Sequence, residues 1–478
     1  MILAALVLVP AIAALGAYTH REAAFRTGWL VGTAVVHAGM VGTVWLTRPA
    51  PVLAGWLAVD ELGLLVVTVL TVLFLAAAVY AVGYLRHENP RGGRAFVSCL
   101  LAFLAAASLV AMSQHLGVLW VGMEASTLAI APLIYHRHER RSLEAVWKYL
   151  VLSSVGIALA LLGTFFLATA QFAAPASDRP LVLPDLVRGA RQLHPAWLKA
   201  AFVFLVVGYG TKMGLAPLHT WKPDTYGEAP SLVGALMAGV LTALAFLGIA
   251  RVMQVMAAAD LAAFAAPVLI GLGLISLAVA AAFIVGQADL KRLLAYSSVE
   301  HMGLLVLGLG LGGSGAYGSA LHLVNNAMAK GLLFFAVGNV VLATGTSAGG
   351  AMRGMGRTLP VSASLLVVGL FAATGSPPFG PFLSEFLILR AAVTGGHLVL
   401  ALAIVVPLTV IFAAMATAIL RVVHGDPDPD APRRAESPWL VAGPVALALG
   451  VLGLGLYLPA PLARVLEQAA ASLGGHGP

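Results

Sequence analysis

Five ionisable side chains stand within long apolar stretches of this sequence. They are three lysines and two glutamates: Lys148, Lys212, Lys330, Glu124 and Glu385. A charge at the centre of a bilayer costs about 3 kcal/mol on insertion scales, so it is seldom kept there without a use. Ammonium and carboxylate groups can both hold or release a proton. The set therefore predicts a relay that carries protons or other cations through a membrane.

The composition explains where these charges must work. Of the 478 residues, 60% are hydrophobic and 10% are charged, whereas soluble domains carry about 25% charged residues. Apolar runs of about 18 residues or more recur along the chain, and each can cross the hydrocarbon core as a helix. Because lipid offers no water to backbone groups, we predict an all-α integral membrane bundle. The net charge of +7 is spread over short loops and does not indicate nucleic acid.

We expect about fourteen transmembrane helices in a single membrane domain, residues 1–478. The expected spans are 2–18, 28–46, 62–85, 95–112, 115–135, 146–170, 199–218, 230–256, 261–285, 291–312, 315–344, 361–390, 395–423 and 438–458. The expected parts of this domain are the N-terminal helices in 1–94, a first repeat in 95–256, a second repeat in 261–423, and the last helix and tail in 438–478. No basic residue precedes the first apolar run, so we interpret it as a membrane helix and not as a signal peptide.

Glycine and proline interrupt two of these expected helices. The seventh contains GYGTKMGLAP at residues 208–217, and the twelfth contains TGSPPFGP at residues 374–381. Proline removes a backbone donor and clashes with the preceding turn. Broken helices at matching places in two halves indicate an inverted-repeat transporter. Because the breaks are five helices apart, helices 4–8 and 9–13 would form two inverted repeats, with two ordinary proline kinks as the alternative.

The distribution of basic residues predicts the orientation. The loops that follow odd-numbered helices hold 16 lysines and arginines, among them Lys222, and the other loops with the C-terminal tail hold 8. Cytoplasmic loops carry the excess of Lys and Arg. We therefore expect a multi-pass protein of the cell inner (cytoplasmic) membrane with both termini outside.

Further polar residues accompany the five charges. His322, Asn326 and Lys330 are spaced four residues apart and share one helical stripe, because each step turns about 400°. His301 follows Glu300 in the tenth expected helix and is expected to join the path. Supporting places are expected for four more residues: His219, Asp224, Thr242 and Asp289. The last of these is the expected N-cap of the tenth helix.

Each candidate also has a structural interpretation. Lys148 lies about one turn from a loop and can reach the surface. Glu124 can be paired permanently with a lysine, and the stripe of His322 and Asn326 can act as a polar contact between helices. The only cysteine, Cys99, is expected to pack in a helix. With one cysteine and no nucleotide or metal motif, we expect no cofactor, no metal and no redox chemistry in this chain.

Three motifs resemble the antiporter-like subunits of respiratory complex I. They are KMGLAPLHTWKPD at 212–224, DLKRLLAYSSVEHMG at 289–303 and FLSEFLIL at 382–389. Within that superfamily, three further segments most resemble component F of group 4 membrane-bound hydrogenases: WVGMEASTLA at 120–129, SLEAVWKYL at 142–150 and WKPDTYGEAP at 221–230. The resemblance covers roughly residues 60–420. It implies proton translocation along a charged axis that contains Glu124, Lys212, Lys330 and Glu385.

This sequence departs from the respiratory relatives in two places. Those relatives usually carry a lysine or histidine in helix 8, but residues 230–256 contain neither, and Thr242 is the nearest polar group there. Asn326 stands where some relatives have histidine. Transfer across helix 8 would then depend on water.

The sequence therefore predicts a proton-translocating, non-redox subunit of an energy-converting oxidoreductase complex, of the hydrogenase or NADH/quinone oxidoreductase type. Its expected partners are the lipid bilayer, other membrane subunits and a peripheral redox arm. Three alternatives remain open: a subunit of a multisubunit cation/proton antiporter, a membrane partner of an inorganic-carbon uptake complex, and a scaffold without a path.

Overall fold

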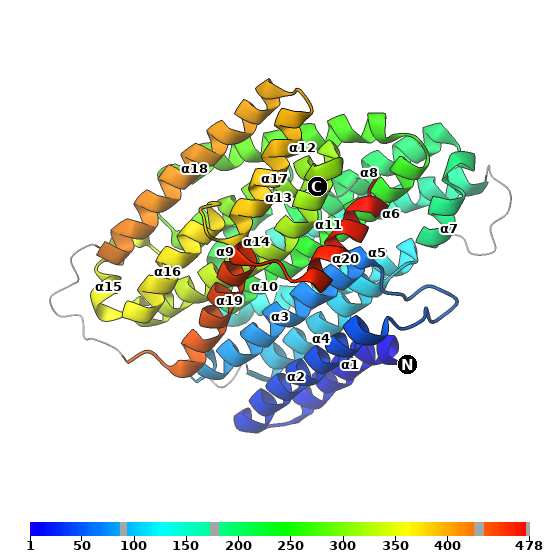
Figure 1. The fold of residues 1–478 in the computed structure, drawn as a ribbon. Coiled ribbons are helices and arrows are strands. Elements are labelled where there is room, and N and C mark those ends of the chain that lie inside the picture. The colour runs from blue at the N-terminus through cyan, green and yellow to red at the C-terminus, as the bar shows by residue number, and fades with distance from the viewer. Residues whose placement is uncertain (87–92, 173–180, 425–434, 475–478) are drawn as a thin grey trace.

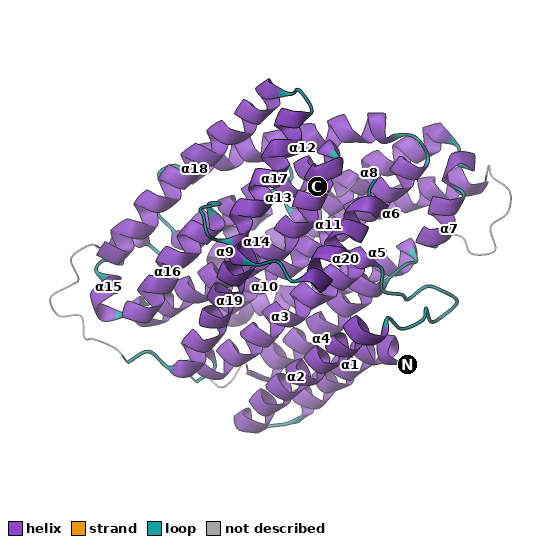
Figure 2. Ribbon diagram, in the orientation of Figure 1, coloured by secondary structure: helices purple, strands orange, loops and turns teal. Residues whose placement is uncertain are grey.

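The computed structural model describes residues 1–86, 93–172, 181–424 and 435–474. These residues form an all-helical bundle in which most long helices run roughly parallel or antiparallel to one another (Figures 1 and 2). The predicted fold class is confirmed.

Twenty α-helices follow one another along the described parts of the chain. Their bounds are α1 Ile2–Thr19, α2 Ala23–Thr47, α3 Glu61–Tyr84, α4 Gly93–Met112, α5 Leu116–Ile134, α6 Arg140–Phe172, α7 Leu183–Arg188, α8 Pro195–Met213, α9 Trp221–Glu228, α10 Ser231–Leu236, α11 Thr242–Ala258, α12 Ala262–Ile284, α13 Leu290–Leu311, α14 Gly313–Thr344, α15 Met355–Thr358, α16 Pro360–Ala373, α17 Gly380–Thr394, α18 Leu398–His424, α19 Pro438–Leu456 and α20 Ala460–Ser472. In the described part of the chain, 13 helices are long and apolar enough to cross a membrane, with α10 and α11 counted as one. The twelfth expected span, 361–390, corresponds to two shorter helices, α16 of 14 residues and α17 of 15 residues.

Both predicted interruptions are present. The seventh expected helix, 199–218, stops at Met213 as α8, and α9 follows beyond its expected end, whereas the twelfth divides into α16 and α17. Each break contains a glycine with a left-handed backbone, Gly214 at φ 78° and Gly375 at φ 60°. A proline follows three residues later, at Pro217 and Pro378. Glycine tolerates this φ without a Cβ penalty, and proline cannot continue the hydrogen-bond ladder of the preceding turn.

Burial divides the bundle into an inner and an outer set of helices. The apolar windows of α10–α11 and of α13 are 100% buried and that of α14 is 83% buried, whereas α18 is 22% buried. Figure 1 shows α18 at one edge of the bundle and α1 and α2 at the opposite edge. The outer helices present apolar side chains to lipid. The inner helices carry the polar groups that lipid would not tolerate.

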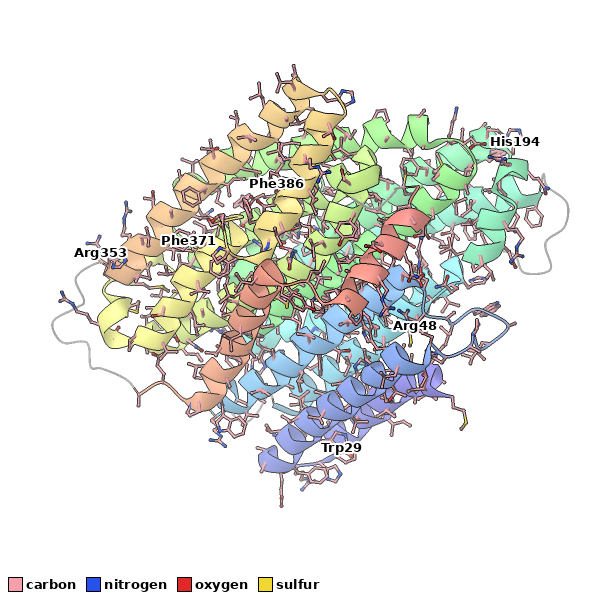
Figure 3. All side chains as sticks on the ribbon, in the orientation of Figure 1. Trp29, Arg48, His194, Arg353, Phe371 and Phe386 are labelled. Carbon is pink, nitrogen blue, oxygen red and sulfur yellow. The ribbon has the colours of Figure 1, made fainter. Side chains whose placement is uncertain are left out.

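Helix ends carry many of the charges that lie outside this core. Arg48 is the C-cap residue of α2, and His194 is the N-cap residue of α8. Figure 3 labels these two side chains, together with Arg353, which lies in the connection before α15. This placement keeps the hydrated groups near the interface and leaves the lipid-facing surface apolar.

Four helices, α7, α9, α15 and α20, lie in segments expected as loops or tail, and α20 is the longest of them. The last expected crossing, 438–458, ends at Leu456 as α19, and residues of the expected tail form α20. Helix α20 packs against α3 and α14 and buries Val465, Leu466, Ala469 and Ala470. That spacing of i, i+3, i+4 is the signal of an amphipathic helix. The segment is too short and too polar to be found as a membrane span.

A buried arginine ties the first helices to the middle of the chain. Arg251 of α11 is 0% exposed and donates from Nη2 to Asp60 Oδ1 at 3.0 Å and to the carbonyl of Ala111 at 3.1 Å. Its Nη1 donates to the carbonyl of Ser113. Asp60 also caps α3 by accepting from the backbone of Gly63. One guanidinium therefore joins α3, α4 and α11.

We predict that Arg251→Met destabilises the protein far more than Arg191→Met. The first change removes the charged partner of Asp60 and the donor to two carbonyls, and should remove about 3 kcal/mol or more. Arg191 pairs with Asp260 in an exposed bridge, with side chains 78% and 70% exposed, which is worth at most about 1 kcal/mol. Thermal unfolding in detergent measures both. Equal losses in the two variants would contradict the assigned role of Arg251.

Candidate functional site

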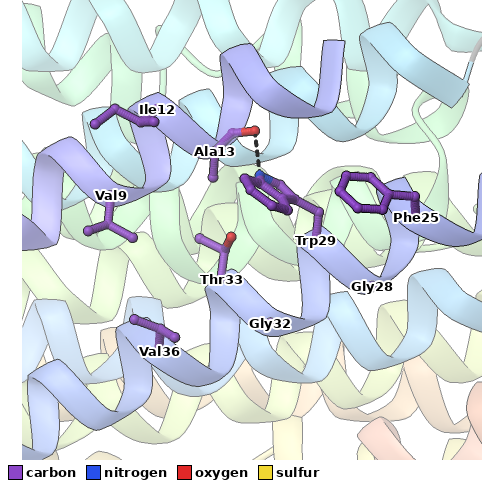
Figure 4. A pocket seen from close by; sticks show the side chains of 9 residues that line it. All are labelled: Val9, Ile12, Ala13, Phe25, Gly28, Trp29, Gly32, Thr33 and Val36. Carbon is purple, nitrogen blue, oxygen red and sulfur yellow. Dashed lines mark hydrogen bonds between the residues drawn. The ribbon is translucent and has the colours of Figure 1, made fainter. Parts of the chain in front are cut away.

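The pocket in Figure 4 lies between α1 and α2 on the outer face of the bundle. Its wall contains Val9, Phe25 and Trp29, and the Trp29 indole donates to the carbonyl of Ala13 at 2.9 Å. None of its nine lining residues, all of them described, is ionisable. A lipid-facing apolar hollow of this kind offers no group that moves a charge, so the site must be sought among the buried ionisable residues.

The first cluster surrounds Lys212, in the last turn of α8. This lysine is 0% exposed, and its Nζ donates to Thr127 Oγ1 and, at 3.1 Å, to the hydroxyl of Tyr149. The ammonium also lies 4.8 Å from the centre of the Tyr149 ring. Its hydrogen-bond partners are therefore neutral hydroxyls, which can bind either the ammonium or the amine.

Glu124 stands one turn before Thr127 on α5 and belongs to the same cluster. Its Oε2 is buried and has no hydrogen-bond partner in the described structure. Glu124 interacts electrostatically with Lys212, but no ion pair within 4 Å joins the two across the described residues. The permanent salt bridge considered as an alternative is therefore not formed. The two groups share a site without neutralising each other by contact.

Lys148 lies apart from this cluster. Its side chain is 42% exposed and pairs with Glu144 and with Asp224, both at 2.8 Å. Asp224, in α9, also pairs with Arg292 of α13 at 3.1 Å. This arrangement matches the structural interpretation of Lys148, in which the lysine reaches the surface of the chain. Asp224 connects the two halves at this end.

The second cluster surrounds Lys330 of α14, which is 0% exposed. Its Nζ donates to Ser297 Oγ at 2.6 Å, and Ser297 donates to Glu300 Oε2 at 3.2 Å. Lys330 also interacts electrostatically with Glu300 and with Glu385. One lysine, two carboxylates and a bridging hydroxyl are therefore gathered inside the bundle, where Lys330 and Glu300 are buried and Glu385 is partly buried.

Two histidines extend this cluster towards α17. His301 Nδ1 and His322 Nε2 are 3.0 Å apart, and His322 Nδ1 lies 2.9 Å from Ser384 Oγ. The donor in each contact depends on the tautomer. His301 Nε2 and Glu385 Oε1 are buried and lack a hydrogen-bond partner in the described chain. An imidazole chain of this form can pass a proton by exchanging tautomers.

The same three groups, His301, His322 and Glu385, could also hold a cation. One ligand atom from each lies within 4.8 Å of the other two. However, both nitrogens of His322 already have partners, and Lys330 interacts electrostatically with both histidines. A protonated lysine beside the group opposes a second cation there.

The predicted stripe on α14 is buried along its length. Asn326 is 2% exposed, between His322 and Lys330, which are each 0% exposed. The Asn326 carbonyl oxygen has no partner among the described residues. The stripe therefore faces the interior of the bundle.

Glu385 reaches back to the break that precedes its own helix. A Cβ on Gly375 would lie 2.0 Å from Glu385 Oε2. The carboxylate therefore occupies the space that any side chain at position 375 would need. Gly375 is therefore required for two reasons: it adopts a left-handed backbone, and it leaves space for the Glu385 carboxylate.

The predicted supporting residues have different surroundings. His219 is 9% exposed, and its Nδ1 has no partner in the described structure. Thr242 donates to the carbonyl of Ala238 at 2.6 Å, beside the π-helical turn Met237–Leu241. Asp289 accepts from the backbone of Arg292 at 2.9 Å, which confirms the predicted N-cap of α13.

Several ionisable residues escaped the prediction. Lys291 and Arg251 were expected in loops but are 2% and 0% exposed. Lys222 was counted with the cytoplasmic loops, but it is 0% exposed in α9. This is a correction, and its cause is the sequence Trp221–Asp224, whose polar and proline content is typical of a loop. Glu300 was noted only as a neighbour of His301, yet it shares the cluster of Lys330.

The fold and its buried charges define a class: a multi-pass membrane protein with broken helices around an internal row of ionisable groups. Residues 113–411 match the family described as NADH:quinone oxidoreductase/Mrp antiporter, TM. The chain belongs to this family. It is an antiporter-like integral membrane protein, as the three motifs had indicated.

Curated relatives agree with this assignment over almost the whole chain. A hydrogenase-4 component F homolog of Methylacidiphilum infernorum is 32% identical over 473 residues, covering 97% of both chains. An NADH-quinone oxidoreductase subunit N of Desulforudis audaxviator is 31% identical, again with 97% of both chains covered. The predicted resemblance to hydrogenase component F and to complex I subunits is confirmed.

Solved structures share the fold. A chain of an archaeal membrane-bound sulfane sulfur reductase superposes with a TM-score of 0.88 at 21% identity, covering 98% of this chain and 97% of that chain. A chain of the Mrp complex from a Dietzia species gives a TM-score of 0.87 at 18% identity, covering 99% and 97%. A chain of respiratory complex I from Thermus thermophilus gives 0.80 at 25% identity, covering 98% and 100%.

We predict that Gly375→Ala displaces the Glu385 carboxylate. A carboxyl-directed carbodiimide should then label Glu385 faster than in the unmodified protein, with Glu385→Gln as the background. The matched control is Gly345→Ala, because Gly345 has φ 76° and nothing within 4 Å of the added Cβ. Both variants should lose about 1–2 kcal/mol of stability from the left-handed backbone. Equal labelling in both would contradict the close approach of Glu385 to Gly375.

Proposed function

We propose that this chain translocates protons across the membrane as a subunit of an energy-converting oxidoreductase complex of the hydrogenase or NADH/quinone oxidoreductase type. One observation carries this proposal: two clusters of ionisable groups lie inside the bundle, and each is centred on a fully buried lysine. Lys212 and Lys330 are each 0% exposed and bond to hydroxyls, with no carboxylate in contact among the described residues. Permanent structural charges in lipid would be expected to be tightly paired.

The clusters suggest an order for the path. Glu124 and Lys212 hold the proton in the first half, and Lys330 is the switching charge of the second. From Lys330 the proton has two possible next acceptors. One is Glu300, reached through the Ser297 hydroxyl, and the other is the pair of His301 and His322. Glu385, at the break between α16 and α17, is the exit group. Lys148 lies outside this order and acts at the end of the bundle.

Translocation needs energy that the chain does not supply itself. Moving one charge against the membrane potential costs about 2.3 kcal/mol per 100 mV. The relatives are named as parts of hydrogenase and NADH-quinone oxidoreductase systems. We infer that other membrane subunits and a peripheral redox arm bind this chain and drive the path by coupled conformational or electrostatic change.

A second candidate is a subunit of a multisubunit cation/proton antiporter, driven by an ion gradient. The superposition with a chain of an Mrp complex favours it. The partners decide between the two. Co-purification of hydrogenase or quinone-oxidoreductase subunits in mild detergent supports the first, and co-purification of antiporter subunits alone supports the second.

We also propose that helices 4–8 and 9–13 are inverted repeats in a cell inner membrane, with both termini outside. The matched glycine and proline spacing in the two breaks supports the repeat. The excess of basic residues in the loops after odd-numbered helices supports the orientation, and it persists without Lys222.

Glu124→Gln and Lys212→Ala should each abolish proton translocation by the assembled complex while the protein still inserts. Each change removes one of the two groups that hold the proton in the first half. Acidification of inverted vesicles, followed with a pH-sensitive dye, measures the effect, and complex abundance is the control. Normal pumping by Glu124→Gln would count decisively against the relay.

Lys330→Met should reduce translocation by about 100-fold or more, the scale of a positioned proton-transfer group. Lys148→Met should reduce it far less, because Lys148 is 42% exposed and paired with surface carboxylates. The same vesicle assay compares the two variants. Equal losses would show that the burial of a residue does not predict how much it contributes to proton translocation.

The orientation can be tested directly. A topology reporter fused after the C-terminal residue should report the outside of the membrane, and one fused at Arg141 should report the cytoplasm. This outcome follows from the excess of basic residues around Arg141. The reverse pattern would overturn the orientation.

A further inference from the structure

Lys222 is a fully buried cation that the path described above does not use. It is the second residue of α9, directly after the break in the seventh helix, and is 0% exposed. Its stem packs against Gly214, where a Cβ would lie 2.4 Å from Lys222 Cδ and 3.0 Å from Nζ. Gly214 has φ 78°. The missing side chain at Gly214 therefore leaves space for Lys222, just as the missing side chain at Gly375 leaves space for Glu385.

The ammonium of Lys222 has one hydrogen-bond partner among the described residues, the hydroxyl of Ser298 on α13, at 3.0 Å. The preceding residue, Ser297, accepts from Lys330. Two lysines from different halves of the chain therefore bind consecutive serines of one helix. Lys222 and Lys330 also interact electrostatically.

Aromatic rings of α9 connect the surroundings of Lys222 to the first cluster. The Tyr226 ring centre lies 5.9 Å from Lys222 Nζ and 6.2 Å from the Trp221 ring, which contacts Tyr149, the partner of Lys212. Trp221 packs on the same Tyr149 ring at 5.2 Å. The first turn of α9 therefore lies between the two clusters.

The neighbouring α10–α11 crossing offers no comparable group at this place. Thr242 uses its hydroxyl on the backbone of its own helix. No ion pair within 4 Å involves Lys222 in the described chain. A lysine that stayed charged here with one hydroxyl partner would be expensive to bury. A lysine that is neutral at rest and protonated only during proton transfer avoids most of that cost.

We propose that Lys222 is the proton carrier that connects the two clusters. Its amine accepts one proton from the Glu124–Lys212 cluster and becomes an ammonium. The ammonium then releases one proton through the hydroxyls of Ser298 and Ser297 to Glu300, and the amine is restored. This inference rests on the proposed function. It names Lys222 as the residue that links the two clusters into one proton path.

Three variants in the native complex test it, with proton translocation per assembled complex measured in inverted vesicles. Lys222→Gln keeps a donor for Ser298 but cannot carry a proton, and should lower translocation by about 100-fold or more. Lys222→Arg keeps a positive charge that is not released in proteins, and should fail in the same way. Lys291→Gln is the matched control, because Lys291 is equally buried but donates to the backbone carbonyls of Gly227 and Ala229. It should translocate normally per assembled complex.

Normal translocation by Lys222→Gln or by Lys222→Arg overturns the proposal, since a neutral group or a fixed charge would then suffice. If Lys222→Gln does not assemble, Ser298→Ala replaces it, because it breaks the link while Lys222 remains. Ser298→Ala should lower translocation by about tenfold or more, and a normal rate overturns the link. Loss in Lys330→Met with normal rates in the Lys222 variants rejects this carrier and leaves the proposed function standing. Normal rates in all variants reject both.

Discussion

The high free energy of a charge in hydrocarbon is the constraint on which this structure depends. Lys212, Lys222 and Lys330 are each 0% exposed, so the bundle shields all three from lipid. Each is bound by serine, threonine or tyrosine hydroxyls, which accept from an ammonium and donate to an amine. Such partners stabilise the lysines without fixing their protonation. The site is therefore built to let charge change.

The helix breaks make this arrangement possible. A continuous helix satisfies its own backbone and offers no room for a side chain along its axis. At each break a left-handed glycine leaves space that a charged side chain fills, Lys222 against Gly214 and Glu385 against Gly375. Irregular backbone at membrane depth is tolerated where it is buried in protein, and both breaks border the inner helices.

Much of the fold and of the candidate site could be predicted from the sequence. Membrane helices are long apolar runs, and an ionisable residue inside such a run can be recognised without a structure. The breaks, the α14 stripe and the Asp289 cap were found in this way. Lys222 was not, since its polar and proline-containing surroundings imitate a loop. The contact between His301 and His322, the serine bridges and the exposed pairing of Lys148 depend on which helices meet, and helix spacing alone does not specify that. The amphipathic α20 was missed because its period is helical but its hydropathy is low.

The central claim is that this chain itself conducts protons for a larger complex. The most direct test is the number of protons moved per turnover, measured in proteoliposomes with the complete complex and with a complex purified from a strain that lacks this chain. The account predicts that removing the chain lowers protons per turnover while the redox reaction of the peripheral arm persists. An unchanged ratio would contradict it.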